Sequence, residues 1–266
     1  MTKIAHLSDI HFGRIIRPEI VEVVVEEVNA LGVELVVVSG DLTQRARPRQ
    51  YEAAVAMLEA FAAPVMVVPG NHDVYPWWRL WLRLFRPLRR YQRYLTELMP
   101  TFERNAIAVL GINSAYGWTV MGGWIGDEER ARIASFFADK DADVFKILVV
   151  HHHLIPIAGV GKRGVTRRGR PTLEAAAQAG VDLVLSGHFH LSHIEPVEVA
   201  SRRLVLVHAG TATSDRGRGP HHGANFYNVI AVTPEGFSIE ERRYDPEVQQ
   251  FKRAGLRRFD RIVSSR

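Results

Sequence analysis

The sequence predicts an α/β protein in which a largely parallel or mixed sheet packs against a second sheet. Short β-branched runs alternate with amphipathic helical segments over the first 75 residues, as in a βαβαβ unit. A polar cluster follows each of these strands, which is typical of ligand sites in open α/β sheets. From Leu204 onward, strand patterns follow one another with little helix between them.

The elements of the first 75 residues follow in order. The predicted strands cover residues 4–7, 35–38 and 65–68. In the helix between the first two strands, Ile20, Val24 and Val28 fall on one face, and Gly32 closes the helix with a left-handed cap. A second helix is predicted at about 49–61.

The later strands are predicted at residues 147–150, 183–185, 204–208, 226–232 and 237–244. We interpret the strands from residue 204 onward as the second sheet, packed against the first. Residues 1–266 are expected to form one domain, with a helical insertion or cap at about 76–104.

The composition limits the function classes that need to be considered. A chain of 266 residues with 47% hydrophobic residues is long enough for one large globular domain. The absence of cysteine excludes disulfides and thiolate metal ligands. No charge-free apolar run reaches the roughly 18 residues that cross a bilayer, and the N-terminus does not resemble a signal peptide. We therefore expect a cytoplasmic protein, with peripheral contact at the inner membrane face as an alternative.

Five short clusters of metal-competent residues each follow a predicted strand. They are Asp9-Ile10-His11, Gly40-Asp41, Gly70-Asn71-His72-Asp73, His151-His152-His153 and Gly187-His188-Phe189-His190. On extended backbone, Asp9 and His11 point the same way and can reach one ion. Each cluster alone has an ordinary structural explanation, such as a capped helix or a half-buried histidine. Five such clusters at one edge of a sheet indicate a metal site instead.

These five motifs, in this order from Asp9 to His190, resemble those of the calcineurin-like metallophosphoesterase family. The resemblance implies a four-layered α/β/β/α sandwich with two mixed sheets and a dimetal site at the sheet edges. It also implies the metal ligands: Asp9, His11 and His190 for the first ion, Asn71, His151 and His188 for the second, and Asp41 as the bridge.

Within the histidine triplet, we choose His151 as the ligand because it directly follows the strand. His152 and His153 are expected beside the ligands or on the surface.

The residue types suit two divalent cations, which we expect to be manganese, iron or zinc. A bridging carboxylate offsets part of the charge of two cations about 3.5–4 Å apart, and the pair makes hydroxide available at neutral pH. Hydrolysis would proceed by in-line attack of this metal-bound hydroxide on phosphorus. By the same resemblance, His72 assists the transition state or protonates the leaving oxygen. Asp73 is expected to orient His72, as carboxylates commonly do for imidazoles.

The segment at 77–99 combines an apolar stripe with a basic one. Apolar residues repeat at spacings of four and three from Trp77 to Leu98, and Pro87 is expected to kink or divide the helix. Six arginines lie between Arg79 and Arg93 without an acid, more than the net charge of +5, so the basicity of the chain is local.

Three interpretations of this segment remain open. The helix packs on the domain or on the partner subunit of a homodimer, it lies at anionic lipid headgroups, or it tracks nucleic-acid phosphates. Nucleic acid is the least favoured of the three.

Several other residues receive no role at this stage. The basic loop at 162–170 is interpreted as solvated, with contact to the substrate phosphate as the alternative. The Gly-rich stretch containing Arg216, His221 and His222 is interpreted as solvated surface rather than as the lining of a substrate cleft. His6 and His208 lie in strand patterns and are expected in the core.

The chain resembles the bacterial cyclic-nucleotide and glycerophosphodiester phosphodiesterase branch of the family, which implies a small phosphodiester as substrate. One alternative is a lipid-linked phosphate or pyrophosphate hydrolase that uses the 77–99 helix as a cap or membrane anchor. A DNA or RNA nuclease is a further alternative. A catalytically silent scaffold would require lost ligands, and all seven are present.

Overall fold

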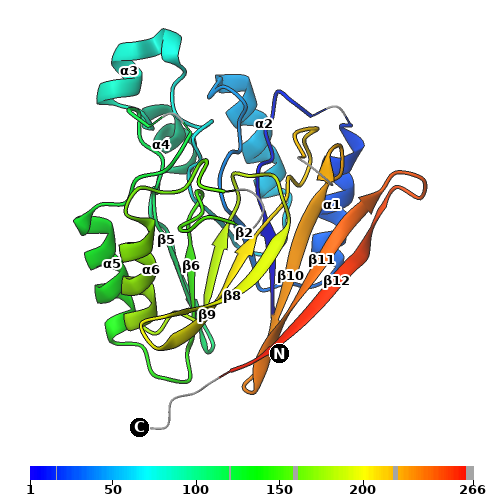
Figure 1. The fold of residues 1–266 in the computed structure, drawn as a ribbon. Coiled ribbons are helices and arrows are strands. Elements are labelled where there is room, and N and C mark those ends of the chain that lie inside the picture. Colours follow the sequence, from blue (N-terminus) through cyan, green and yellow to red (C-terminus); the bar gives the residue numbers. More distant parts are fainter. Residues whose placement is uncertain (16, 120, 158–160, 218–220, 262–266) are drawn as a thin grey trace.

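In the computed structural model, two six-stranded sheets pack face to face and helices cover their outer faces (Figure 1). The structure describes residues 1–15, 17–119, 121–157, 161–217 and 221–261. The strands of the first sheet are β1 (Thr2–Leu7), β2 (Leu35–Val38), β3 (Val65–Val67), β10 (Phe226–Val232), β11 (Gly236–Asp245) and β12 (Gln250–Asp260). Those of the second sheet are β4 (Thr101–Arg104), β5 (Ile107–Gly111), β6 (Phe145–Val149), β7 (Leu183–Ser186), β8 (His193–Val199) and β9 (Arg202–His208).

The helices form the two outer layers. The first sheet is covered by α1 (Glu19–Ala30) and α2 (Pro48–Glu59), and the second by α5 (Asp127–Ala138) and α6 (Gly169–Gln178). The four-layered α/β/β/α sandwich with two mixed sheets is therefore confirmed.

The strands are apolar on both faces because both faces are covered. In β2, Leu35 and Val37 point into the core between the sheets, whereas Val36 and Val38 pack against the helices. This alternation fixes the register of the strand, since a slip of one residue would exchange the two faces. The carboxyl ends of the parallel strands are thereby held at one edge of the sandwich.

The prediction that all strands from residue 204 onward form the second sheet was wrong. β10 pairs antiparallel with β1, with Ala5 opposite Val229, and β11 and β12 extend the same sheet. β9 joins the second sheet through parallel pairing with β7. The pattern of apolar residues identifies a strand but does not specify which strand it pairs with.

The segment after β3 is divided at Pro87, as expected, into η1 (Trp77–Arg79) and α3 (Leu80–Phe85) before it and α4 (Arg89–Leu95) after it. The predicted single apolar stripe was wrong, because Tyr91 is buried whereas Trp81 is exposed. Proline removes a helical hydrogen bond and restricts the residue before it, so the two halves face different ways. The helical part is also shorter than 76–104, because β4 is an edge strand of the second sheet.

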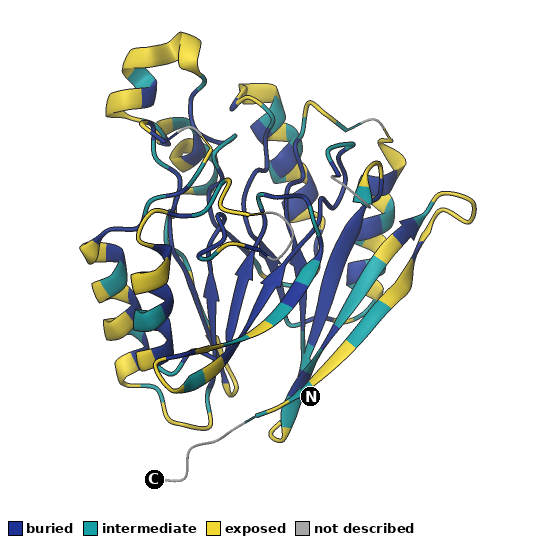
Figure 2. Cartoon of the chain, viewed as in Figure 1, coloured by how far each residue is buried: buried dark blue, intermediate teal, exposed yellow. Residues whose placement is uncertain are grey.

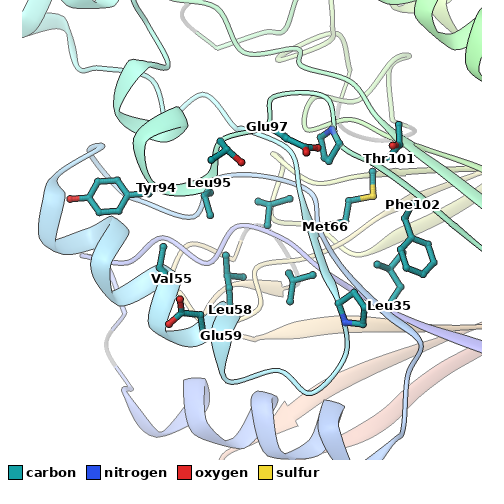
Figure 3. Close-up of a pocket in the computed structure, with 15 residues that line it drawn as sticks. Leu35, Val55, Leu58, Glu59, Met66, Tyr94, Leu95, Glu97, Thr101 and Phe102 are labelled. Carbon is teal, nitrogen blue, oxygen red and sulfur yellow. The ribbon is translucent and has the colours of Figure 1, made fainter.

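A cavity of about 530 Å³ lies between α2, α4 and the edge strands β3 and β4 (Figure 3). Its walls are largely apolar and include Leu58, Leu95 and Phe102. Among the described residues, no helix is both long enough and apolar enough to span a bilayer.

Candidate metal centre

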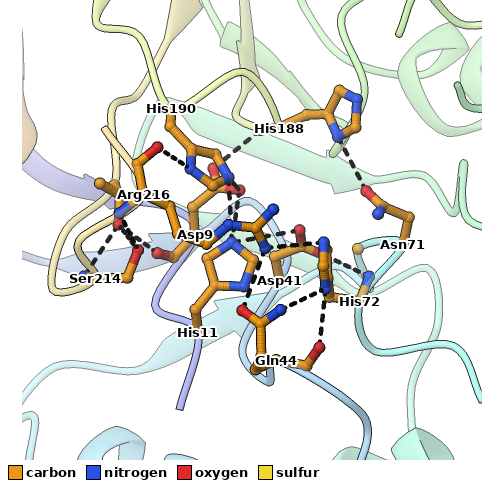
Figure 4. Close-up of polar contacts among 12 residues, drawn as sticks. Asp9, His11, Asp41, Gln44, Asn71, His72, His188, His190, Ser214 and Arg216 are labelled. Carbon is orange, nitrogen blue, oxygen red and sulfur yellow. Dashed lines mark hydrogen bonds and ion pairs between the residues drawn. The ribbon is translucent and has the colours of Figure 1, made fainter. Parts of the chain in front are cut away.

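The seven predicted ligands lie at the carboxyl ends of five parallel strands, along one edge of the sandwich. Figure 4 shows six of them, Asp9, His11, Asp41, Asn71, His188 and His190. The first sheet supplies Asp9 and His11 after β1, Asp41 after β2 and Asn71 after β3. The second sheet supplies His151 after β6 and both His188 and His190 after β7. The structure therefore brings together side chains from across the first 190 residues.

Four of these side chains form one buried cluster. The metal-competent atoms of Asp9, His11, Asp41 and His190 all lie within 4.8 Å of one another. His190 Nε2 is 3.1 Å from Asp9 Oδ1 and 3.2 Å from His11 Nε2. This set matches the ligands expected for the first ion together with the expected bridge.

Asn71, His151 and His188 form a second cluster beside the first. Asn71 Oδ1 lies 3.2 Å from His151 Nε2 and 2.9 Å from His188 Nδ1. Asp41 stands between the clusters, because its Oδ2 atom is 3.7 Å from His11 Nε2 and 3.5 Å from His151 Nε2. One carboxylate thus faces both sets of donors.

The donor atoms fit divalent cations. Asp9 Oδ1 is buried and makes no hydrogen bond within the described part of the chain. The Nδ1 atom of His190 donates to the Arg216 carbonyl at 2.7 Å, and that of His151 donates to the Ser39 carbonyl at 2.7 Å. In rings that bind a metal in the neutral form, these bonds would leave the Nε2 lone pairs directed into the centre. Oxygen and imidazole donors of this kind suit manganese, iron and zinc.

The centre holds its carboxyl groups in the ionised form that metal ligands require. Burial alone would raise the pKa of Asp9, but His190 and His11 outweigh it and hold that pKa well below its ordinary value. Burial likewise opposes ionisation of Asp41, and His151 and His72 outweigh it, so the pKa of Asp41 is also well below its ordinary value. For His188, burial lowers the pKa well below the ordinary value, which keeps the ring neutral.

The backbone at the centre is strained. Asp9, His11, Asp41, His188 and His190 all have positive φ, between 53° and 73°. Each such non-glycine residue costs about 1–3 kcal/mol and persists only where its surroundings impose the conformation. Strain of this kind is concentrated at functional sites, and here it falls on five of the seven predicted ligands.

The close approach of Gly70 to Asp41 explains why the third motif begins with a glycine. A Cβ atom added there would lie 2.1 Å from Asp41 Oδ1. Only glycine lets the backbone approach the Asp41 carboxylate so closely.

His72 lies beside the centre with both ring nitrogens engaged. Its Nδ1 donates to the Gln44 carbonyl at 2.9 Å, and its Nε2 accepts a hydrogen bond from Arg216 at 2.9 Å. Its backbone N–H donates to Asp41 at 2.8 Å. The ring is 4.9 Å from that of His11, measured between centroids. His72 is thus close enough to contact a substrate bound at the centre.

The prediction that Asp73 orients His72 was wrong. The Asp73 carboxylate accepts hydrogen bonds from the backbone N–H groups of Leu42, Thr43 and Gly70, at 3.2, 2.9 and 3.0 Å. Burial, and then the charge of Asp41, raise the pKa of Asp73 to about 7, although the hydrogen bonds from Gly70 and Thr43 act to lower it. Asp73 faces the loop after β2 and holds it against the third motif, whereas the Gln44 carbonyl orients the His72 ring.

Arg216 is a site residue that the sequence reasoning missed. The loop after β9 is fastened to the first motif, since Thr211 Oγ1 donates to the Asp9 carbonyl and Thr213 Oγ1 to the Ile10 carbonyl, both at 2.7 Å. The Arg216 guanidinium reaches His72 and also donates to Gln44 Oε1 at 3.2 Å. This loop is therefore not simply solvated surface. The sequence signal that could have identified Arg216 was the position of its loop after a strand of the second sheet.

The other histidines of the triplet are buried. His152 lies beside the ligands, as expected, with Nδ1 2.8 Å from Ser114 Oγ and a ring nitrogen within the cluster of His151 and His188. The loop at 162–170 also reaches the centre, because a Cβ added at Gly164 would lie 2.7 Å from His188 Nε2. His6 and His208 are buried in the core, as predicted.

Known proteins resemble this chain in sequence. Residues 2–192 match the family model described as calcineurin-like phosphoesterase. The chain is 28% identical over 200 residues to the glycerophosphodiester phosphodiesterase GpdQ of Enterobacter lignolyticus, which covers 70% of each chain. It is 24% identical over 159 residues to the 3',5'-cyclic adenosine monophosphate phosphodiesterase CpdA of Haemophilus influenzae, covering 59% of this chain and 54% of the relative.

Solved structures share the fold at low sequence identity. A purple acid phosphatase from yellow lupin superposes with a TM-score of 0.73 at 12% identity, over 97% of this chain and 53% of that one. A dimetal phosphatase from Danio rerio gives a TM-score of 0.69 at 11% identity, over 97% and 98% of the two chains. The family match, the relatives and the fold lead to one conclusion: the chain belongs to the calcineurin-like phosphoesterase family and is a metal-dependent phosphoester hydrolase.

Proposed function

We propose that the protein is a dinuclear phosphodiesterase that hydrolyses a small diester such as a cyclic nucleotide or a glycerophosphodiester. The observation that carries the proposal is the place of Asp41, whose Oδ2 atom lies 3.7 Å from His11 and 3.5 Å from His151. A carboxylate facing two donor sets is the arrangement that binds two neighbouring cations. The names of two relatives, a glycerophosphodiester phosphodiesterase and a cyclic AMP phosphodiesterase, support the substrate class.

The proposed ligands are Asp9, His11 and His190 for one cation, Asn71, His151 and His188 for the other, and Asp41 for both. When bound, two ions of manganese, iron or zinc would supply Lewis acidity and a hydroxide nucleophile at neutral pH.

His72 and Arg216 carry the remaining chemistry in this proposal. The Arg216 guanidinium can donate to phosphoryl oxygens, whose negative charge grows in the transition state. His72 lies against the same space and would contact the leaving oxygen, with the Gln44 carbonyl fixing the angle of its ring. Arg216 donates a hydrogen bond to His72, and we infer that a phosphate ester would bind between the two side chains.

The test is reconstitution of chelated protein with manganese, iron or zinc, followed by metal analysis and a substrate screen. The screen compares bis(p-nitrophenyl) phosphate, p-nitrophenyl phosphate, cyclic nucleotides, glycerophosphodiesters and single-stranded DNA. We expect two ions per chain and faster turnover of small diesters than of the monoester. A single tightly bound ion would contradict the dinuclear centre, and preference for the monoester would contradict the diesterase proposal alone.

A lipid-linked phosphate ester is the second candidate substrate. The specific observation is that the Trp78 ring lies 5.9 Å from the guanidinium of Arg45, the residue next to Gln44. The exposed Trp78 therefore lies near the residue that follows Gln44, whose carbonyl contacts His72, and the apolar part of such a substrate could rest on its ring. A UDP-linked lipid added to the same screen would reveal this activity.

A further inference from the structure

Residues 77–85 form a protrusion whose outer surface is apolar. Trp81 is 76% exposed and Phe85 is 69% exposed, and their rings stack with centroids 5.5 Å apart. In Figure 2 this segment, labelled α3 in Figure 1, projects beyond the body of the sandwich and is mainly exposed. Its exposed large apolar side chains are Trp77, Trp78, Leu80, Trp81, Leu84 and Phe85. A contiguous apolar patch of this kind marks an interaction surface.

A buried arginine holds the protrusion in place. Arg83 donates to the carbonyl groups of Tyr75 and Thr119, at 2.6 and 2.8 Å, and its guanidinium lies 4.1 Å from the centre of the Trp77 ring. A helix of six residues has little stability of its own. These contacts fix its inner side to the domain, so the outward direction of the apolar side chains is built into the fold.

Four exposed arginines, in the protrusion or in the residues that follow it as far as α4, form what we call the arginine rim. Arg79, Arg86, Arg89 and Arg93 are exposed, and the sequence has no acidic residue between Asp73 and Glu97. A second copy of this chain would bring arginine against arginine across a two-fold axis, without acids in this segment to pair them. An anionic membrane surface matches both properties, because aromatic side chains enter the lipid boundary while arginines meet headgroup phosphates.

We propose that the 77–85 protrusion and its arginine rim dock on a membrane that contains anionic phospholipids. The apolar side chains would enter the headgroup boundary to a depth of about 5–10 Å. Trp78 lies close to Arg45, the residue after Gln44, whose carbonyl accepts a hydrogen bond from His72, so docking would bring the edge of the sandwich that carries His72 toward the lipid surface.

Vesicle co-sedimentation tests the proposal. The probes are phosphatidylcholine vesicles with and without phosphatidylglycerol, at low and high salt. The wild-type chain should bind only the anionic vesicles, and high salt should weaken binding. The double variant Arg86→Gln/Arg89→Gln should bind about 25-fold more weakly, since each basic residue near an anionic surface contributes about fivefold. The double variant Trp81→Ser/Phe85→Ser should bind at least about tenfold more weakly, because it loses two inserted rings.

Two single-residue controls make changes of the same kind, apolar to serine and arginine to glutamine, elsewhere on the surface. Val248→Ser removes an apolar side chain that is 47% exposed in the turn between β11 and β12. Arg132→Gln removes an exposed arginine from α5. Both should bind like the wild type.

The outcomes separate membrane docking from its rivals. Absence of vesicle binding, or binding that the protrusion variants leave unchanged, overturns the proposal. If Trp81→Ser/Phe85→Ser instead converts a dimer to a monomer in sedimentation velocity, the surface is a subunit interface and the proposal also fails. Binding is measured without substrate, so the result is independent of the proposed phosphodiesterase activity.

Discussion

Removal of the Arg216 side chain should slow turnover without loss of metal. The two parts of this residue act on different groups. Its backbone carbonyl accepts the hydrogen bond from His190 Nδ1 at 2.7 Å, whereas its guanidinium donates to His72 Nε2 at 2.9 Å. Arg216→Ala retains the carbonyl and removes only the guanidinium. His190 therefore keeps its orientation in the variant.

The expected magnitude follows from the role of the lost donor. Removal of one preorganised donor to a developing oxyanion lowers kcat about 10²- to 10³-fold, equivalent to about 2.7–4 kcal/mol. Arg216→Lys should fall between wild type and alanine, because it keeps the charge but loses the planar fork. Arg14→Ala is the matched control, since Arg14 is 59% exposed and pairs with the neighbouring Asp215 at 3.1 Å. An exposed pair contributes little, so the control should stay close to wild type.

The assay combines steady-state hydrolysis of bis(p-nitrophenyl) phosphate with metal analysis of the same samples. We expect Arg216→Ala to retain the metal content of the wild type and lose most of its kcat. Parallel loss of metal and activity would show that the side chain only supports the fold of the loop. Unchanged kcat would show that the Arg216 side chain does not contact the substrate in the transition state.

Four further predictions address the centre and the fold. His72→Ala should keep its metals and lose turnover about 10²- to 10⁴-fold, and unchanged turnover would exclude His72 from the reaction. His151→Ala should lower the metal content by about one ion per chain and His152→Ala should not; the reverse result would move the ligand by one residue. Burial lowers the pKa of His6 from 6.5 to about 3. Between these values the unfolded chain binds more protons than the folded chain, so the free energy of unfolding decreases as the pH falls. His6→Gln should reduce that fall by about 1.4 kcal/mol per pH unit in urea titrations between about pH 6 and 4, and an equal slope would contradict the assignment. Phe137→Ala, at a fully buried position against the second sheet, should lower the free energy of unfolding by about 3–5 kcal/mol, and a loss below about 1 kcal/mol would show that the site collapses around the smaller side chain.

The positions of the predicted ligands could be predicted from the sequence because each lies within four residues of the carboxyl end of a strand. Asp9 comes two residues after the end of β1, and His151 two residues after the end of β6. Parallel strands bring such positions to one edge whatever their order in the sheet. The prediction that the five motifs lie together therefore did not require the strand order of the sheets.

The sheet assignment depended on long-range pairing, which local patterns do not record. β10 is apolar at nearly every position, as is typical of a strand covered on both faces, and β9 has a buried apolar run from Leu204 to Val207. The pairing of Ala5 with Val229 joins parts of the chain that are far apart in sequence. Strand identity was therefore predictable, whereas the partner of each strand was not.

The errors at the site have a similar origin. Asp73 follows His72 in sequence, and that adjacency suggested a contact. The turn instead directs its carboxylate toward the backbone of the loop after β2. Arg216 lies far from the five motifs in sequence, and only the anchoring of its loop on Asp9 and Ile10 brings it to His72.

The division of the donor set between the two sheets links metal affinity to the packing of the sandwich. Asp9, Asp41 and Asn71 follow strands of one sheet, and His151 and His190 follow strands of the other. Ions bound by residues of both sheets would hold the sheets together, so metal binding would also stabilise the packing of the sandwich. Loss of a side chain packed between the sheets, such as Ile147, would then also be expected to weaken metal binding.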